Sequence, residues 1–172
     1  MMKKSVIVLI GVILFGCKSS QPINNSYSKT EINLILDNWH NAAGKADFDA
    51  YFNVLTEDAI YIGTDPTENW NKPAFIKFAK PYFDRGKAWN FTALERNIYF
   101  SSDKKIVWFD ELLNTQMKIC RGSGVLVDEG NGKWKIKHYV LSMTIPNDNT
   151  DEVVKIKSLI EDKEIEKLKK GE

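Results

Sequence analysis

The sequence predicts an α+β fold in which helices pack on one face of a bent antiparallel sheet. Apolar residues recur at helical spacing in the first part of the chain, and from Trp89 onward they alternate with polar residues as in β-strands. Short polar turns separate those strands, and the Asn131-Gly132 pair is a strong hairpin signal. Helices followed by a meander of strands are typical of α+β domains.

Length and composition indicate one globular domain. The chain has 172 residues, of which 43% are hydrophobic, so it can bury a sizeable core. Its net charge of +1 argues against nucleic acid as a partner, because nucleic-acid-binding proteins need a basic surface to neutralise phosphates. Aromatic residues make up 12% of the chain and include five tryptophans, which fits a bulky core or an apolar cavity.

Residues 1–16 are predicted to be a signal peptide. An early pair of lysines precedes an apolar run at 6–15 that is too short to span a bilayer but suits a signal-peptide core. The run ends at Gly16 and Cys17, which resembles a bacterial lipoprotein signal, in which a small residue precedes the lipidated cysteine. The resemblance implies a cell-envelope protein anchored to a membrane through Cys17, at the periplasmic face or the surface, with 17–27 as a tether. An ordinary secretory signal or a short anchor is the alternative.

Three helices are predicted before the main strands. Ser28 and Glu31 form a capping box at the start of the first helix. Asp47 can cap a short second helix and Asn71 a third, in which Pro81 should cause a kink or an early end. Their apolar residues are Ile32, Ile35, Leu36, Trp39 and Ala43 in the first, Phe48, Tyr51, Phe52 and Leu55 in the second, and Phe75, Phe78, Ala79, Tyr82 and Phe83 in the third.

Strands are predicted around and after the third helix. A short strand covers residues 59–62, and the four longer ones cover 91–101, 105–113, 117–128 and 133–145. The folded domain is expected to span 28–148. Residues 149–172 are predicted to form an amphipathic C-terminal helix, whose acidic start and lysine-rich end suit the helix dipole.

The alternation in the last strand is the most regular pattern in the chain. One face carries Lys135 and Lys137 and is expected to be in water. The opposite face is therefore expected to point inward, which places a histidine and a serine in an apolar interior and suggests a pocket. This expected inner face consists of Trp134, Ile136, His138, Val140 and Ser142. The other histidine, His40, is expected at the surface of the first helix.

Several short motifs follow one another in a recognisable order across residues 28–148. They are D-F-D at 47–49, Y-I-G-T-D-P at 61–66, K-P-Y-F at 80–83, W-F-D-E at 108–111, C-R-G-S-G-V-L at 120–126, G-K-W-K-I-K-H-Y-V-L-S at 132–142 and I-P-N-D at 145–148. This order resembles the SnoaL-like branch of the nuclear transport factor 2-like (NTF2-like) superfamily. The resemblance implies a conical barrel of a curved sheet packed against three helices, with a pocket at its open mouth, often in a dimer. It implies no single activity, because the superfamily includes isomerases, cyclases, dehydratases, epoxide hydrolases and binding domains.

An acid–base pair is the hypothesis for catalysis. His138 supplies a side chain of the type that changes charge near neutrality, and the carboxyl group of Asp110 or Glu111 would have a raised pKa inside an apolar cone. Trp108 and Asp110 are the favoured inward residues of their strand, although a bulge would turn Glu111 inward instead. Such a pair could abstract a proton next to a carbonyl or add water. The alternative is a structural ion pair between a carboxylate and Arg121.

Eight residues are candidates for lining a ligand pocket. Arg121 could hold an anionic group through two hydrogen bonds, and Asp65 lies in a loop near the expected mouth. Trp70 and Trp89 flank the third helix and could form an aromatic rim, with core packing as the alternative. The full set is Tyr61, Asp65, Trp70, Trp89, Trp108, Arg121, Ser123 and Ser142.

Three functions are compatible with the sequence. The first is a lipid-anchored envelope protein that binds a small, largely apolar molecule in a conical pocket, with a homodimer as an option. The second is a cofactor-free enzyme of the isomerase, dehydratase, cyclase or hydrolase type that uses His138 with Asp110 or Glu111. The third is a structural lipoprotein that binds a partner through its sheet face and final helix. No cofactor or metal is expected, because the histidines lack ligand spacing and no phosphate-binding loop occurs.

Overall fold

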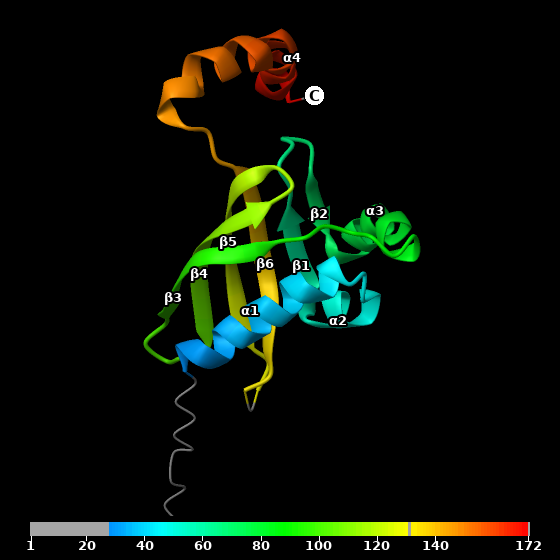
Figure 1. Cartoon of the computed structure of the whole chain (residues 1–172), viewed down its shortest axis with the longest axis vertical. Helices are drawn as coiled ribbons and strands as arrows, with labels where there is room; N and C mark the ends of the chain where they lie inside the picture. The colour runs from blue at the N-terminus through cyan, green and yellow to red at the C-terminus, as the bar shows by residue number, and fades with distance from the viewer. Residues whose placement is uncertain (1–27, 131, 172) are drawn as a thin grey trace, which may run out of the picture.

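The computed structural model of the chain describes residues 28–130 and 132–171. It confirms the α+β class (Figure 1). The predicted signal peptide, the lipidation site at Cys17 and the tether lie outside the described residues. The helices are α1 (Lys29–Gly44), α2 (Phe48–Asn53), α3 (Lys72–Asp84) and α4 (Thr150–Lys170), with a 3₁₀ turn, η1, at Asn147–Asn149. The strands are β1 (Leu55–Ile62), β2 (Asn69–Asn71), β3 (Thr92–Phe100), β4 (Ile106–Thr115), β5 (Lys118–Asp128) and β6 (Trp134–Met143).

The three predicted helix caps are present. Ser28 and Glu31 form a reciprocal capping box, in which the Glu31 amide donates to the Ser28 hydroxyl at 3.3 Å and the Ser28 amide donates to the Glu31 carboxylate at 3.0 Å. Asp47 accepts from the Ala50 amide, and Asn71 accepts from the Ala74 amide, each at 3.0 Å. Helix α3 continues past Pro81 to Asp84.

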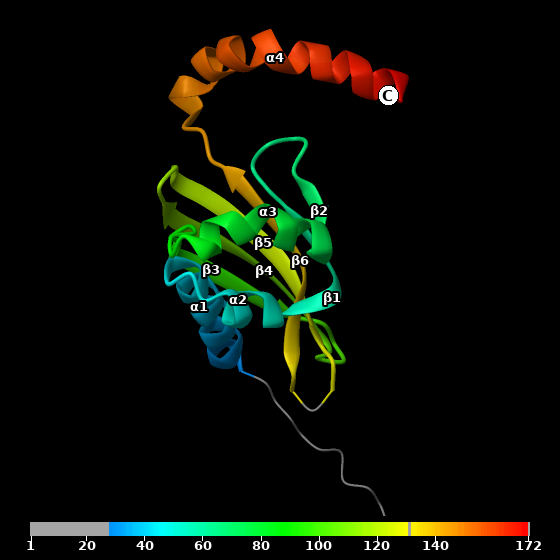
Figure 2. The same ribbon diagram turned by 90° about the vertical axis from the view of Figure 1, so that its right-hand side faces the viewer.

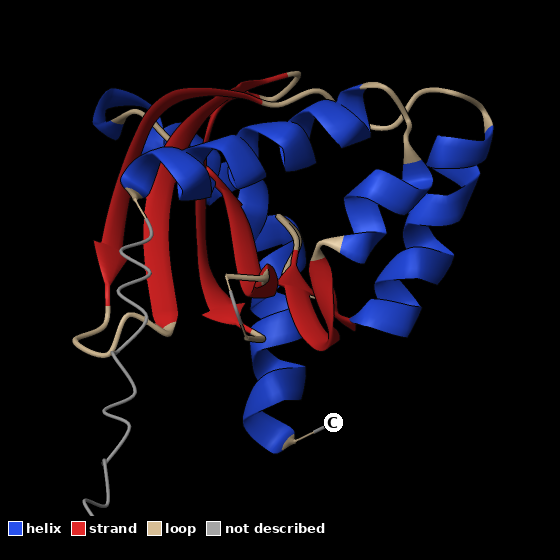
Figure 3. Ribbon diagram, turned by 90° about the horizontal axis from the view of Figure 1, so that it is seen from below, coloured by secondary structure: helices blue, strands red, loops and turns tan. Residues whose placement is uncertain are grey.

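The strands form one curved sheet, and their order is β2-β1-β6-β5-β4-β3. Strands β3 to β6 form the predicted antiparallel meander, and β1 joins it in parallel along β6. The expected barrel is therefore an open, six-stranded sheet with free edges at β2 and β3. Helices α1, α2 and α3 cover its concave face (Figures 1 and 3). The three-residue strand β2, which the sequence pattern did not predict, extends the sheet just before α3.

A β-bulge in β6 reverses the predicted orientation of His138. Val125 of β5 lies opposite His138, whereas Leu126 lies opposite Ile136, so β6 has one extra residue at Lys137. The buried face of β6 consequently changes phase, from Trp134 and Ile136 before the bulge to Tyr139 and Leu141 after it. His138, Val140 and Ser142 therefore lie on the opposite, outer face of the sheet. The expectation that they point inward is wrong.

The favoured orientation of β4 is also wrong. Phe109 and Glu111 are buried under the helices, whereas the side chain of Trp108 is 46% exposed and Asp110 lies on the outer face with it. No bulge is involved here, because β4 pairs in unbroken register with β5. In the register with β5, Trp108 lies opposite Val125 and Asp110 lies opposite Ser123. We call this side of the sheet the outer sheet face; it carries Tyr99, Trp108, Asp110, Arg121, Ser123, Val125, His138, Val140 and Ser142.

Aromatic side chains fill the space between the sheet and the helices. Trp39 of α1 stacks on Tyr51 of α2 at 5.1 Å between ring centroids and meets the edge of Tyr139 of β6 at 4.8 Å. Tyr51, Tyr139 and Phe75 are almost wholly buried, as is Phe109 behind them. Around these side chains, the interior of the cone that the resemblance implied is thus a packed core.

Helix α4 lies beyond the end of the sheet, apart from the other helices (Figures 1 and 2). The chain reaches it from β6 through η1. Its apolar side chains remain in solvent, with Ile156, Leu159 and Ile160 each more than two-thirds exposed (68%, 78% and 74%). Among the described helices, none combines the length and apolar character needed to cross a membrane.

Candidate ligand pocket

A pocket of about 200 Å³ lies at the end of the domain where α3 approaches the β1–β2 hairpin. Its walls come from β1, β2, α3 and the segment between α3 and β3. We call it the aromatic pocket, and its rings are those of Tyr61, Trp70, Phe75, Phe78, Tyr82, Trp89 and Phe91. Leu141 of β6 and Met117 of the β4–β5 turn also line it.

The rings of the aromatic pocket support one another by stacking. Phe75 lies against Tyr61 at 4.0 Å between centroids and against Trp70 at 5.7 Å. Trp70 also stacks on Phe78 at 4.3 Å, which joins β2 to α3. Because each ring is held by a neighbour from another element, the pocket wall is preformed.

A single acidic side chain, Glu68, enters this aromatic surface. Its carboxylate accepts a hydrogen bond from the Asp65 amide at 3.2 Å, within the tight loop between β1 and β2. Asp65 itself accepts from the Thr67 amide and hydroxyl at 2.9 and 2.6 Å. Burial raises the pKa of Tyr61, and the nearby charge of Glu68 raises it further. The Tyr61 phenol therefore stays neutral beside the pocket.

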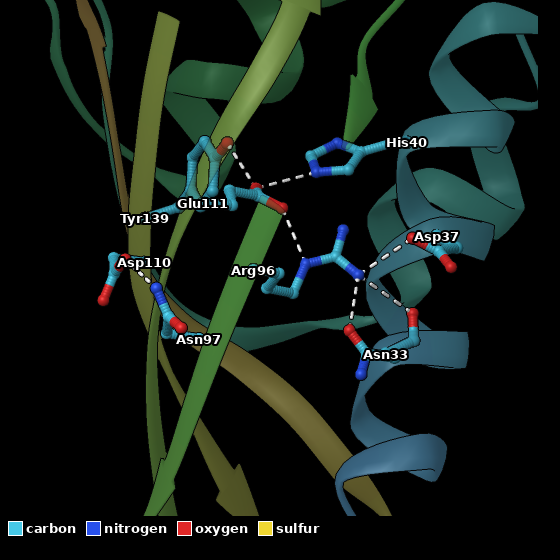
Figure 4. A network of polar contacts seen from close by, with 8 residues as sticks. All are labelled: Asn33, Asp37, His40, Arg96, Asn97, Asp110, Glu111 and Tyr139. Atoms are coloured by element: carbon cyan, nitrogen blue, oxygen red, sulfur yellow. Dashed lines mark hydrogen bonds and ion pairs between the residues drawn. The ribbon is translucent and has the colours of Figure 1, made fainter. Parts of the chain in front are cut away.

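A second polar constellation lies deeper, outside the pocket (Figure 4). The Glu111 carboxylate is 2.8 Å from His40 Nε2 and 2.8 Å from Arg96 Nε, and it accepts from the Tyr139 hydroxyl at 3.0 Å. Arg96 Nη1 donates onward to Asn33 Oδ1 at 3.0 Å and to Asp37 Oδ1 at 2.8 Å, both on α1. We call His40, Arg96, Glu111 and Tyr139 the Glu111 network.

The protein environment keeps Glu111 ionised. Burial alone would raise the pKa of its carboxyl group, but the hydrogen bond and charge of His40 and the charge of Arg96 outweigh burial and hold that pKa below its ordinary value. Burial and the negative charge of Glu111 together raise the pKa of Tyr139 well above its ordinary value, so this phenol remains a donor. With three donors on one buried carboxylate, the network is suited to joining α1 to the sheet.

The predicted acid–base pair does not form. Glu111 and His138 project to opposite faces of the sheet, and the histidine that contacts Glu111 is His40. Asp110 does share the outer sheet face with His138, but β5 lies between their strands, and Asp110 accepts from Asn97 Nδ2 at 3.1 Å. His40, expected at the surface, is only 3% exposed.

The predicted pocket residues divide into three groups. Tyr61, Trp70 and Trp89 line the aromatic pocket together. Asp65 instead lines a wider hollow of about 400 Å³ between its loop and Ile165 of α4. The remaining four are on the outer sheet face, away from the pocket, namely Trp108, Arg121, Ser123 and Ser142.

Sequence reasoning missed the Glu111 network, although one signal for it was present. His40 continues the i, i+4 spacing of Ile32 and Leu36, which places it on the buried stripe of α1. Arg96 lies opposite Glu111 in the β3–β4 register, which only the strand pairing reveals. Glu68 was not among the predicted pocket residues, although it follows Asp65 in the same loop.

Comparison with known proteins supports the fold. The family described as SnoaL-like domain matches residues 32–146. No curated protein sequence matches the chain significantly.

Three solved structures illustrate the likeness in fold. An NTF2-like protein of unknown function from Pseudomonas putida KT2440 superposes with a TM-score of 0.58 at 12% identity, over 70% of this chain and 89% of that one. A structure named as a candidate ketosteroid isomerase from Parabacteroides distasonis ATCC 8503 gives 0.57 at 14% identity, over 73% and 95% of the two chains. The association domain of CaMKII from C. elegans gives 0.53 at 18%, over 66% and 94%.

Proposed function

Because the chain belongs to the SnoaL-like domain family, whose fold hosts pockets for small molecules, we propose that it binds a small, largely apolar molecule in the aromatic pocket. We also propose that it does so as a lipid-anchored protein of the bacterial cell envelope, on the evidence of the signal-like sequence that ends at Cys17. The observation that carries the binding proposal is the preformed cavity of about 200 Å³ with walls of stacked rings.

The size of the cavity restricts the ligand. Pockets for drug-sized molecules usually have volumes of about 300 to 1,000 Å³. The aromatic pocket is smaller, and the packed core of Trp39, Tyr51 and Tyr139 prevents a ligand from reaching deeper. The ligand is therefore a compact molecule held near the surface.

The geometry favours binding over the enzymatic alternative. An enzyme that used His138 with Asp110 or Glu111 would need these groups around one substrate, yet the sheet separates His138 from Glu111. The buried Glu111 is already engaged by three donors. In the part of the chain that the structure describes, neither histidine lines the aromatic pocket.

A pair of tryptophan substitutions tests the proposal. Met117 borders the pocket, and Ile119, two residues further on, is exposed on the sheet. We expect compact apolar alcohols such as cyclohexanol, benzyl alcohol and 3,3-dimethylbutan-1-ol to raise the melting temperature of the full-length chain saturably, because they bind the folded state. Met117→Trp fills the pocket and should abolish the shift, whereas Ile119→Trp should preserve it. No shift with any probe, or equal shifts in both variants, would contradict the proposal.

Self-association through the outer sheet face is a second candidate. Tyr99 and Trp108 stack there at 5.9 Å between centroids while remaining almost half exposed, and Val125 lies beside them. One structurally similar protein is named as an association domain. Sedimentation equilibrium should show a dimer that Trp108→Glu converts to a monomer; a monomer at all concentrations would remove this candidate.

A further inference from the structure

The aromatic pocket has one charged group on its wall, the carboxylate of Glu68. Within residues 28–130 and 132–171, no lysine, arginine or histidine forms an ion pair with it. By contrast, the buried Glu111 is paired with Arg96 and contacts His40. A partly buried carboxylate on an apolar wall without a counter-ion is complementary to a ligand that brings a positive charge.

The carboxylate has a defined position against the wall. The Asp65 amide holds one of its oxygens, and its side chain lies directly over Gly63. A side-chain carbon at residue 63 would come within 3.0 Å of Glu68 Cβ, so this approach depends on glycine. Glu68 lines the same pocket as the rings of Tyr61 and Trp70.

The surrounding rings favour the same kind of ligand. The face of an aromatic ring is electron-rich and attracts cations, most strongly in tryptophan. Trp70, Phe78 and Trp89 all line the pocket. Tyr82 already takes part in such a contact, since the Arg85 guanidinium lies 4.5 Å from its ring centroid.

We propose that the aromatic pocket takes a compact organic cation, an alkylated ammonium group whose charge lies against Glu68 and whose methyl groups lie against Trp70, Phe78 and Trp89. This inference rests on the proposed function and specifies its ligand class. A quaternary ammonium group presents apolar methyl groups and a diffuse charge, which matches a wall that is mostly aromatic with one carboxylate. The cavity of about 200 Å³ suits a group of that size.

Choline and 3,3-dimethylbutan-1-ol have nearly the same shape, but only choline is charged, so comparing them isolates the effect of the charge. Their affinities for the full-length chain would be measured by calorimetry in non-ionic detergent, with chloride concentration matched. We expect choline to bind about tenfold more tightly than the alcohol, in line with a desolvated cation–π contact supported by a carboxylate. Glu68→Gln keeps the side-chain length and should remove that advantage without weakening the alcohol. Glu95→Gln removes an exposed charge on β3 and should change neither affinity.

Each outcome decides a different point. Equal affinities for choline and the alcohol, or a choline affinity that Glu68→Gln leaves unchanged, would overturn the cation inference but keep a small-molecule pocket. Binding of the neutral alcohols without binding of choline would likewise overturn the cation inference and leave the small-molecule pocket in place. Failure of every probe would overturn both the inference and the proposed function.

Discussion

His40 Nε2 of α1 lies 2.8 Å from the carboxylate of Glu111 of β4, 71 positions later in the chain, in a part of the core closed to solvent. The contact joins the first helix to β4, the strand next to the β3 edge of the sheet, and Arg96 of β3 makes a second connection between helix and sheet through Asp37. A buried carboxylate loses its hydration on folding, so these donors must replace water. The Glu111 network thereby has a structural explanation that involves no ligand.

Replacing each histidine by alanine should lower the stability of the protein by very different amounts. His40→Ala removes a buried ring and a partner of Glu111, and we expect it to lower the free energy of unfolding by about 3 kcal/mol. His138 lies on the outer sheet face, so His138→Ala should lower the free energy of unfolding by no more than about 1 kcal/mol. Urea denaturation measures both values. Equal losses would contradict the assigned orientations.

Adjacent carboxylates on β4 provide a second comparison. Glu111→Gln leaves Arg96 with a neutral neighbour in the core, and we expect a loss of about 3 to 5 kcal/mol. Asp110→Asn keeps a hydrogen-bonding partner for Asn97 on the outer sheet face and should cost less than about 0.5 kcal/mol. Chemical denaturation would again measure the two losses. A larger loss for Asp110→Asn than for Glu111→Gln would contradict the orientation of these side chains on β4.

The Glu111 carboxyl group should titrate below its ordinary pKa of 4.5. A pKa that folding lowers stabilises the native state above the unfolded-state value, and this contribution is lost as pH falls through the native pKa. The carboxyl ¹³C shift of Glu111 in the folded protein should therefore titrate with a midpoint below pH 4.5. A midpoint at or above that value would show that burial outweighs His40 and Arg96.

Gly124 should be intolerant of a side chain. A methyl group there would lie 2.6 Å from the His138 carbonyl oxygen and 2.8 Å from a ring carbon of Phe109. We expect Gly124→Ala to cost about 2 kcal/mol, because the obstructing oxygen belongs to the backbone of β6. Ser123→Ala, on the outer sheet face, serves as the control and should cost less than about 1 kcal/mol. Similar melting temperatures for the two variants would be inconsistent with the β5–β6 packing.

Lipid anchoring through Cys17 makes its own prediction. Bacteria that express the chain with an alkyne-tagged fatty acid should yield a labelled protein in the membrane fraction. Cys17→Ser should lose the label, whereas a Ser19→Ala control should keep it. A Cys17→Ser protein that stays labelled would exclude this cysteine as the acceptor.

Signals confined to a few neighbouring residues predicted much of the fold. The capping box at Ser28, the caps at Asp47 and Asn71, and the alternating strands of the meander each depend on local hydrogen bonding or periodicity. Trp70 and Trp89, for which the sequence left an aromatic rim and core packing open, both line the aromatic pocket.

Side-chain orientation was harder to predict because both faces of β4 carry an aromatic residue and a carboxylate. Trp108 and Phe109 look equivalent in sequence, yet only Phe109 is buried. In β6, the extra residue at Lys137 changes the phase of alternation. The buried residues Ile136 and Tyr139 are three positions apart instead of two, as a bulge requires, but only the pairing of β6 with β5 establishes the bulge.

The central claim, a small-molecule site in the aromatic pocket, is tested most directly through the indole N–H signals of the five tryptophans. Trp70 and Trp89 line the pocket, Trp39 and Trp134 are buried elsewhere, and Trp108 is on the outer sheet face. In ¹H–¹⁵N spectra of the full-length chain titrated with 3,3-dimethylbutan-1-ol and then choline, the account predicts saturable shifts of Trp70 and Trp89 with at least one probe, while the other three signals stay in place. Shifts confined to Trp108, or no shift with either probe, would contradict it.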